Sequence, residues 1–186
     1  MAIVHFLLLS FSGLFLPSQF EKDTIILEDF NPASHLRWVI VNDGVMGGVS
    51  NSKIQITEDN YGWFSGNLSL RNNGGFASTR AMIAGKDLSQ TKKIGIRIKG
   101  DGRSYSLRFR TDRNLDGIAY AVNFDTIQDE WIELDWSYSD FRPTFRGRTV
   151  RAPELESNTI RQMSIMLSDG LEGEFEVFID WVKAYY

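Results

Sequence analysis

Arginine is well suited to binding an anion, because its planar fork can donate to two oxygens at once, and it recurs at alternate positions of two segments. In residues 93–99 isoleucines alternate with polar residues that include Arg97, and in residues 104–111 Tyr, Leu and Phe alternate with Arg108 and Arg110. Such alternation predicts strands that bury one face. The arginines therefore belong to the outward faces of two predicted strands.

The turn Gly100-Asp101-Gly102-Arg103 separates these strands and predicts a hairpin. In a hairpin Arg97, Arg108 and Arg110 would share one sheet face, where like charges are unfavourable unless something neutralises them. Neutralisation would come from local carboxylates, or from an anionic or polyhydroxyl ligand or an acidic partner surface. Asp101 and Arg103 of the turn are further candidate binding residues.

Three more arginines are candidates for the same surface. Arg80 lies in the predicted strand 76–83, where it is either paired with Asp43 or open to a ligand. Arg146 and Arg148 lie in a predicted loop that can fold over the sheet. Together these arginines predict a polar sheet face that binds a protein partner.

Two glycine-rich blocks, residues 42–48 and 72–75, predict loops at the rim of the fold. One interpretation is structural: Asp43 binds the amides of its own turn, around a Val-Met pair of buried type. The other is a ligand-binding rim that includes Asp43, Met46 and Asn73. Neither block is a phosphate loop, because no Gly-Lys-Ser/Thr follows it.

The residues for catalysis are scarce. The chain has no cysteine and only two histidines, His5 and His35, which excludes thiolate chemistry and leaves no visible nucleophile–base pair. The only metal considered is a structural calcium ion held by Glu28, Asp29 and Asp180, which pairing of the chain ends would bring together. The alternative is that these carboxylates are separate and face solvent. No other cofactor is expected.

Residues 1–20 contain no Lys, Arg, Asp or Glu, and their apolar run is short for a bilayer span but suits a signal-peptide core. We expect a removable export signal and a periplasmic or secreted protein. The alternative is an apolar extension packed on a cytoplasmic domain. The net charge of −4 disfavours nucleic acid as a partner.

Composition and turn spacing predict the fold. Aromatic residues (13 Phe, 6 Tyr, 5 Trp) accompany 16 Gly, and short apolar or alternating runs are separated by Asn/Asp-Gly turns. We predict one all-β sandwich or jelly roll over residues 24–186. Its strands are expected at 24–27, 38–41, 53–57, 63–70, 76–83, 93–99, 104–111, 118–124, 131–135, 163–167 and 174–185.

The order of several motifs gives a family resemblance. Residues 38–50 read WVIVNDGVMGGVS, and they are followed by NNGGFASTR at 72–80, KGDGRSY at 99–105 and IDWV at 179–182. This series resembles the complex I intermediate-associated protein 30 family over nearly all of residues 24–186. With no Arg in the leader, and so no mitochondrial transit peptide, the chain looks more like a bacterial member.

The resemblance implies a galactose-binding-domain-like jelly roll that takes part in complex I assembly, without enzymatic activity. Its partner would then be a protein, such as a membrane-complex subunit or a client of a chaperone-like factor. The alternative is a carbohydrate-binding module on the same scaffold. Trp131, Trp136, Tyr138 and Phe141 are the candidates for stacking on a sugar ring, unless they pack in the core.

Overall fold

The computed structural model describes residues 24–33, 36–83, 85–113 and 117–186. The expected leader, residues 1–20, lies outside the described residues. Within them the chain is all β, with short 3-10 turns at η2 (Asp43–Met46), η3 (Arg71–Asn73), η4 (Tyr138–Asp140) and η5 (Ser157–Thr159). The thirteen strands of the described residues are β1 (Thr24–Glu28), β2 (Trp38–Ile40), β3 (Asn51–Ile56), β4 (Gly62–Leu68), β5 (Ala77–Met82), β6 (Lys93–Lys99), β7 (Ser104–Arg110), β8 (Ala119–Asp125), β9 (Trp131–Ser137), β10 (Arg142–Phe145), β11 (Arg148–Thr149), β12 (Gln162–Leu167) and β13 (Gly173–Tyr185).

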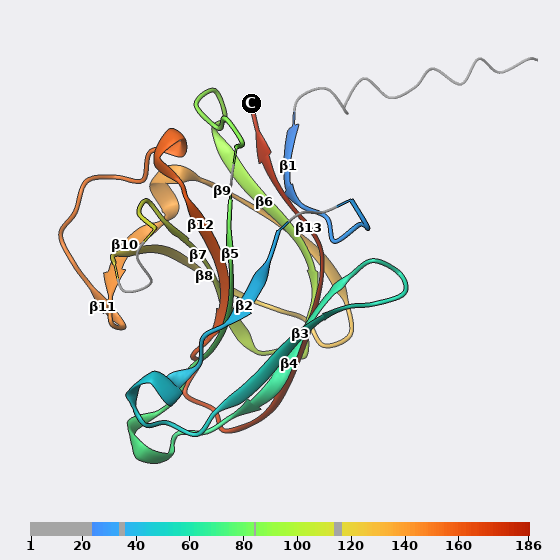
Figure 1. The fold of residues 1–186 in the computed structure, drawn as a ribbon, viewed down its shortest axis with the longest axis vertical. Helices are drawn as coiled ribbons and strands as arrows, with labels where there is room; N and C mark the ends of the chain where they lie inside the picture. Colours follow the sequence, from blue (N-terminus) through green and yellow to red (C-terminus); the bar gives the residue numbers. More distant parts are fainter. Residues whose placement is uncertain (1–23, 34–35, 84, 114–116) are drawn as a thin grey trace, which may run out of the picture.

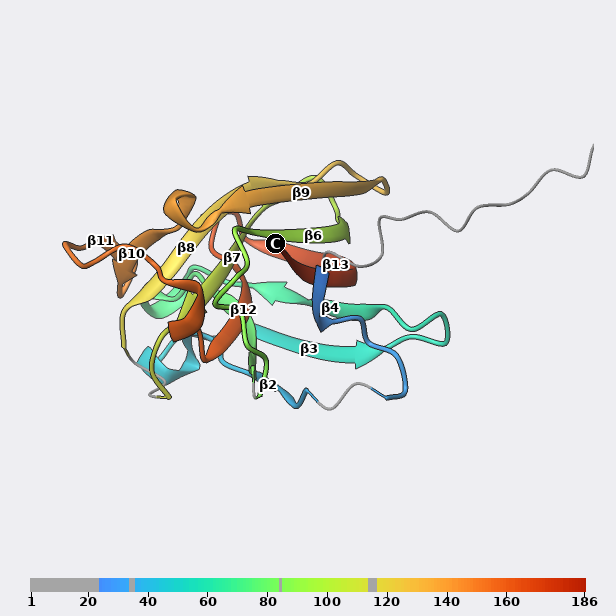
Figure 2. The same cartoon turned by 90° about the horizontal axis from the view of Figure 1, so that it is seen from above.

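These strands form two sheets that pack face to face (Figures 1 and 2). The six-stranded sheet has the order β3-β4-β13-β6-β9, and β1 also pairs with β13. The seven-stranded sheet has the order β11-β10-β8-β7-β12-β5-β2. All strand pairs within these sheets are antiparallel, so the predicted all-β sandwich is confirmed.

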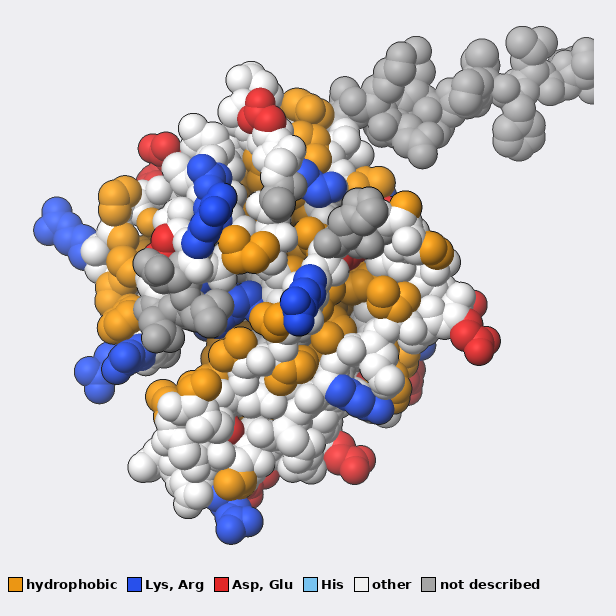
Figure 3. Space-filling model, viewed as in Figure 1, with side chains coloured by type: hydrophobic (Ala, Val, Ile, Leu, Met, Phe, Trp, Pro, Cys, Tyr) orange, Lys and Arg blue, Asp and Glu red, His pale blue; other side chains and the backbone are white. Residues whose placement is uncertain are grey.

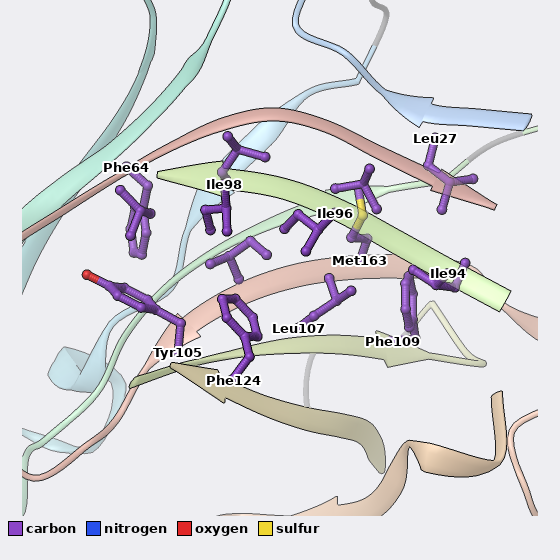
Figure 4. Close-up of a cluster of buried hydrophobic side chains, with 14 of the residues drawn as sticks. Leu27, Phe64, Ile94, Ile96, Ile98, Tyr105, Leu107, Phe109, Phe124 and Met163 are labelled. Carbon is purple, nitrogen blue, oxygen red and sulfur yellow. The ribbon is translucent and has the colours of Figure 1, made fainter. Parts of the chain in front are cut away.

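Alternating apolar residues from both sheets fill the space between them, as Figure 4 shows for β6 and β7. The isoleucines of β6 and the apolar residues of β7 are almost completely inaccessible to water. Each fully buried side chain of this size contributes about 1.5–3 kcal/mol. The buried residues of these two strands are Ile94, Ile96, Ile98, Tyr105, Leu107 and Phe109. The inward faces predicted from alternation are therefore confirmed.

All eleven predicted strands are present, with boundaries shifted by three residues or fewer. Two short strands, β10 and β11, were not predicted. The sequence did not predict β10 because this strand contains Pro143. Proline cannot donate a hydrogen bond to a neighbouring strand, and it is usually found at a sheet edge. Here Pro143 lies opposite Tyr120 of β8, close to the outer end of the seven-stranded sheet.

The predicted hairpin of β6 with β7 was wrong. β6 pairs with β13 and β9 in the six-stranded sheet, whereas β7 pairs with β8 and β12 in the seven-stranded sheet. The turn at residues 100–103 therefore carries the chain from one sheet to the other. Both strands keep their apolar faces toward the core, so their outward faces point in opposite directions.

Candidate binding surface

Arg97 is separated from the other arginines by this crossing and lies on the outer face of the six-stranded sheet. Its guanidinium pairs with Asp180 of β13 and, at 3.4 Å, with Glu133 of β9. It also lies 4.6 Å from the centre of the Trp131 ring. Local carboxylates therefore neutralise Arg97, as one of the two interpretations expected.

On the opposite side of the molecule, three arginines lie in one row across the outer face of the seven-stranded sheet. The strand register places six residues in turn from β2 to β10: Val39, Arg80, Ser164, Arg108, Ala121 and Arg142. Arginines thus occupy alternate strands, about 10 Å apart, with a small residue between each pair. We call these six residues the arginine row; it contains no acidic residue.

Arg108 is at the centre of the row and donates to neutral atoms. Its guanidinium lies 3.1 Å from the Met166 sulfur and 3.1 Å from the Thr144 hydroxyl. Burial, together with the positive charges of Arg110 and Arg80, lowers the pKa of Arg108 to about 10. The side chain remains charged at neutral pH, but its charge is held at an energetic cost.

Arg110 lies on the same face of β7 as Arg108, two residues further along the strand, and so lies beside the row. It donates a hydrogen bond to the carbonyl oxygen of Gly117. Arg80 is 7% exposed, Arg108 is partly buried and Arg142 is exposed, so access to solvent increases toward β10. Arg146 and Arg148 lie beyond the row, in the β10–β11 hairpin at the sheet edge. Both are exposed there, and neither covers the sheet through a loop as expected.

Asp43 is completely buried and joins the two glycine-rich blocks. Its carboxylate accepts hydrogen bonds from the hydroxyl (2.6 Å) and amide (3.0 Å) of Ser50 and from the amides of Gly75 (2.7 Å) and Phe76 (3.4 Å). Burial alone would raise the pKa of Asp43, but these hydrogen bonds hold it below its ordinary value. Asp43 therefore turns to loop amides rather than to Arg80.

Two glycines make room for this carboxylate. A Cβ atom at Gly48 would lie 2.3 Å from Asp43 Cγ, and one at Gly74 would lie 2.5 Å from Asp43 Oδ2. Both distances are far below van der Waals contact, so any larger residue would displace Asp43. The two blocks form one rigid support, with Asp43 inside it.

The apolar pair in the first block is not buried, contrary to expectation. Val45 is 74% exposed and Met46 is 59% exposed, because η2 buries Asp43 and leaves these two side chains in solvent. Asn73 is exposed in η3, with a positive φ of 58°. Of the three rim residues predicted to bind, Met46 and Asn73 are therefore accessible, and Asp43 is not.

Asp101 and Arg103 are engaged in a network within the protein. Arg103 forms a two-bond ion pair with Asp169 (2.7 and 2.9 Å) and also donates to the carbonyl oxygen of Glu174 at 3.2 Å. Asp101 accepts from the Tyr105 hydroxyl at 3.0 Å. The hydrogen bond from Arg103 lowers the pKa of Asp169 in spite of its burial. This network connects the β6–β7 crossing to the turn before β13.

The proposed calcium ligands do not come together. β1 does pair with β13, but the Glu28 carboxylate accepts from the amides of Asp29 and Phe30 and from the Trp38 indole. Asp180 pairs with Arg97 on the outer face of the six-stranded sheet. In the part of the chain that the structure describes, no group of three or more acidic or histidine side chains is placed to hold a metal ion.

The expected stacking residues do not form one platform. Trp136 packs in the core, 5.6 Å from Phe124 and 6.3 Å from Phe141 between ring centres. Trp131 lies on the outer face of the six-stranded sheet, next to Arg97. The same face carries a stacked ring pair, Trp63 and Phe178, whose ring centres lie 6.1 Å apart. The arginine row, by contrast, has no aromatic member.

The two packed sheets define the class of fold: an all-β jelly-roll sandwich that matches the galactose-binding-like jelly rolls of carbohydrate-binding modules in structure. The chain superposes with a TM-score of 0.61 on the family 11 carbohydrate-binding module of Clostridium thermocellum, at 18% identity, covering 88% of this chain and 95% of that one. It also matches part of the agarase AgWH50C, with a TM-score of 0.60 and 8% identity, covering 89% of this chain and 25% of that one. At these identities the similarity concerns the fold.

The family is shown by the sequence match. The family described as complex I intermediate-associated protein 30 (CIA30) matches residues 28–179, and the chain belongs to it. A relative is the Schizosaccharomyces pombe (strain 972 / ATCC 24843) protein called Uncharacterized protein C9E9.15. It is 29% identical over 167 residues, which covers 77% of this chain and 75% of the relative. Because that relative is fungal, the bacterial source stays a prediction.

The described residues contain no helix that is long and apolar enough to cross a membrane. The chemistry available on the arginine row is the donation of hydrogen bonds from positively charged groups. A guanidinium fork that reaches solvent in this row can bind a carboxylate of an extended ligand that crosses the strands.

Proposed function

We propose that this domain is non-catalytic and binds an acidic segment of a protein partner along the arginine row. The observation that carries the proposal is the position of Arg108, which is partly buried among positive charges and donates to two neutral atoms. Holding a cation in such surroundings costs stability, and a carboxylate from a partner would recover that cost.

The family supports a protein as the partner. Its name refers to an intermediate of complex I, and an assembly factor acts by holding another subunit rather than by transforming a substrate. Under this proposal the ligand is an acidic segment of a membrane-complex subunit. Arg80 and Arg108 supply the inner contacts, and Arg142 supplies the outer one.

The test uses fluorescein-labelled hexaglutamate as the probe, with binding followed by fluorescence anisotropy at low and high ionic strength. Arg108→Met should weaken binding by roughly tenfold to a hundredfold, since a charge-assisted hydrogen bond contributes about 1.5–3 kcal/mol. The melting temperature should stay the same or rise, because a costly charge is removed. Arg97→Met is the matched control on the other sheet and should bind the probe as the wild type does.

Equal affinity of the wild type and Arg108→Met for hexaglutamate would refute the proposal. A large loss of stability in Arg108→Met would also count against it, because it would show that the charge is already neutralised within the protein.

A carbohydrate ligand is the second candidate, and a different surface favours it. Trp63 and Phe178 are partly exposed and lie nearly parallel on the six-stranded sheet, with 7° between their ring planes. Aromatic rings of this kind can stack on the apolar faces of sugars. The similar module of Clostridium thermocellum was solved in complex with a β-1,3-1,4-mixed-linked tetrasaccharide. Calorimetry with that tetrasaccharide tests this candidate: binding that Trp63→Ala abolishes would support it, and no heat of binding would exclude this ligand.

A further inference from the structure

A pocket of about 960 Å³ lies beside the β2 end of the arginine row. It is lined by residues of β1, β2, β5 and β12, and by the described residues 29, 31, 33, 36, 37, 85 and 86 between them. Its volume is within the range of small-ligand sites. Arg80 belongs both to the pocket wall and to the arginine row, so the two are continuous.

Several apolar side chains of the pocket wall are exposed to solvent and do not belong to the hydrophobic core. Ile26, Val39 and Met82 line it, and they are 42%, 40% and 40% exposed. Val39 and Met82 come from the outward faces of β2 and β5, so neither belongs to the core. Figure 3 shows hydrophobic and basic side chains close together over the region of these strands. Exposed apolar side chains that converge on one pocket are typical of a binding site.

The acidic groups of the pocket wall serve the protein itself. Glu28 accepts hydrogen bonds from two backbone amides and from the Trp38 indole, and Asp29 accepts from the Asn31 side-chain amide at 2.5 Å. Three basic residues line the same wall: Arg37 is exposed, Arg80 is 7% exposed, and Lys86 donates to the carbonyl oxygen of Ile26 at 2.6 Å. An apolar group with a negative charge beside it fits these surroundings better than a neutral or basic ligand.

We infer that the pocket holds an aliphatic side chain of the same acidic segment, next to the carboxylate that binds Arg80. This inference rests on the proposed function and adds a specificity element to it. From Val39 in β2 to Arg142 in β10 the row crosses five interstrand spacings, or about 24 Å. An extended chain of about seven residues spans that distance. The ligand is therefore a short acidic segment with a leucine-like residue at the end that reaches Val39 and Met82.

The experiment compares two labelled, end-blocked peptides: hexaglutamate with leucine added at one end, and hexaglutamate with serine added at that end. Both orientations are made, and affinity is measured by anisotropy on the full chain. In one orientation the leucine peptide should bind about tenfold more tightly, because its side chain leaves water. In the double variant Val39→Ser, Met82→Gln the ratio of the two affinities should fall to about one. The control Val45→Ser, Ile56→Gln removes apolar groups that are exposed elsewhere on the surface (74% and 59%) and should keep the wild-type ratio.

Equal binding of both peptides by the wild type, in both orientations, would overturn the inference. So would a ratio that survives the double variant Val39→Ser, Met82→Gln. The proposed function is tested separately by Arg108→Met, which should weaken the leucine and serine peptides by the same factor. If it does so while leucine gives no advantage, the arginine row stands and the pocket inference fails.

Discussion

Replacing Asp43 by alanine should destabilise the protein strongly, because one carboxylate connects two loops. Its two shortest hydrogen bonds, from the Ser50 hydroxyl and the Gly75 amide, are charge-assisted and contribute about 1.5–3 kcal/mol each. Their sum is about 3–6 kcal/mol, and water that enters the exposed loops will recover part of it. We therefore expect a loss of about 3 kcal/mol, or a melting temperature lower by about 6–12 °C.

Urea denaturation followed by tryptophan fluorescence measures this loss, with Asp59→Ala as the control. Asp59 is an exposed acid at the tip of the β3–β4 hairpin, and its removal should change stability by less than about 0.5 kcal/mol. If Asp43→Ala unfolds at the same urea concentration as Asp59→Ala, the carboxylate does not support the loops.

The pH dependence of the same measurement gives an independent check. The folded pKa of Asp43 is below its ordinary value of 3.8, so the folded state favours the charged carboxylate. This contribution is complete above the unfolded pKa and is lost as the pH falls through the folded pKa. The difference in stability between the wild type and Asp43→Asn should therefore shrink as the pH falls below about 4. A difference that stays constant down to the acid transition would refute the role of the charge.

Two further predictions concern the scaffold. Arg103→Ala should lower the free energy of unfolding by about 3–5 kcal/mol, because it leaves Asp169 buried without its partner. Arg97→Ala, on an exposed surface, should lower it by less than about 1 kcal/mol. Equal losses of the two variants in urea denaturation would contradict this ranking. A chain that begins at Lys22 should keep the wild-type melting temperature if residues 1–20 are a removable export signal, and a far lower value would assign them to the fold.

Alternation was sufficient to predict which residues of β6 and β7 face the core, but it could not predict which strands pair. A Gly-Asp-Gly turn specifies a local change of direction, and that geometry serves a hairpin and a crossing between sheets equally well. The pairing depends on distant contacts: β6 pairs with β13 at separations of at least 79 residues (Lys99 with Phe178), and β7 pairs with β12 at separations of at least 52 residues (Arg110 with Gln162). Arg97 was for that reason assigned to the wrong sheet.

Arg142 was missed for a different reason. It lies in β10, a strand of four residues that contains Pro143 and shows no apolar alternation in the sequence. Its place in the arginine row became visible only from the register of β10 with β8. Val45 and Met46 show the opposite error: residue type alone predicts burial, but η2 buries Asp43 and leaves these two side chains exposed.

The placement of β12 and β13 has a consequence for synthesis on the ribosome. β13 is the central strand of the six-stranded sheet, and β12 joins β7 to the β5–β2 end of the other sheet. A nascent chain that still lacks residues 162–185 therefore has neither of these strands, and its earlier strands have unpaired edges. Folding must wait until almost the whole domain has left the exit tunnel, and during that interval the exposed edges are open to aggregation or to a chaperone.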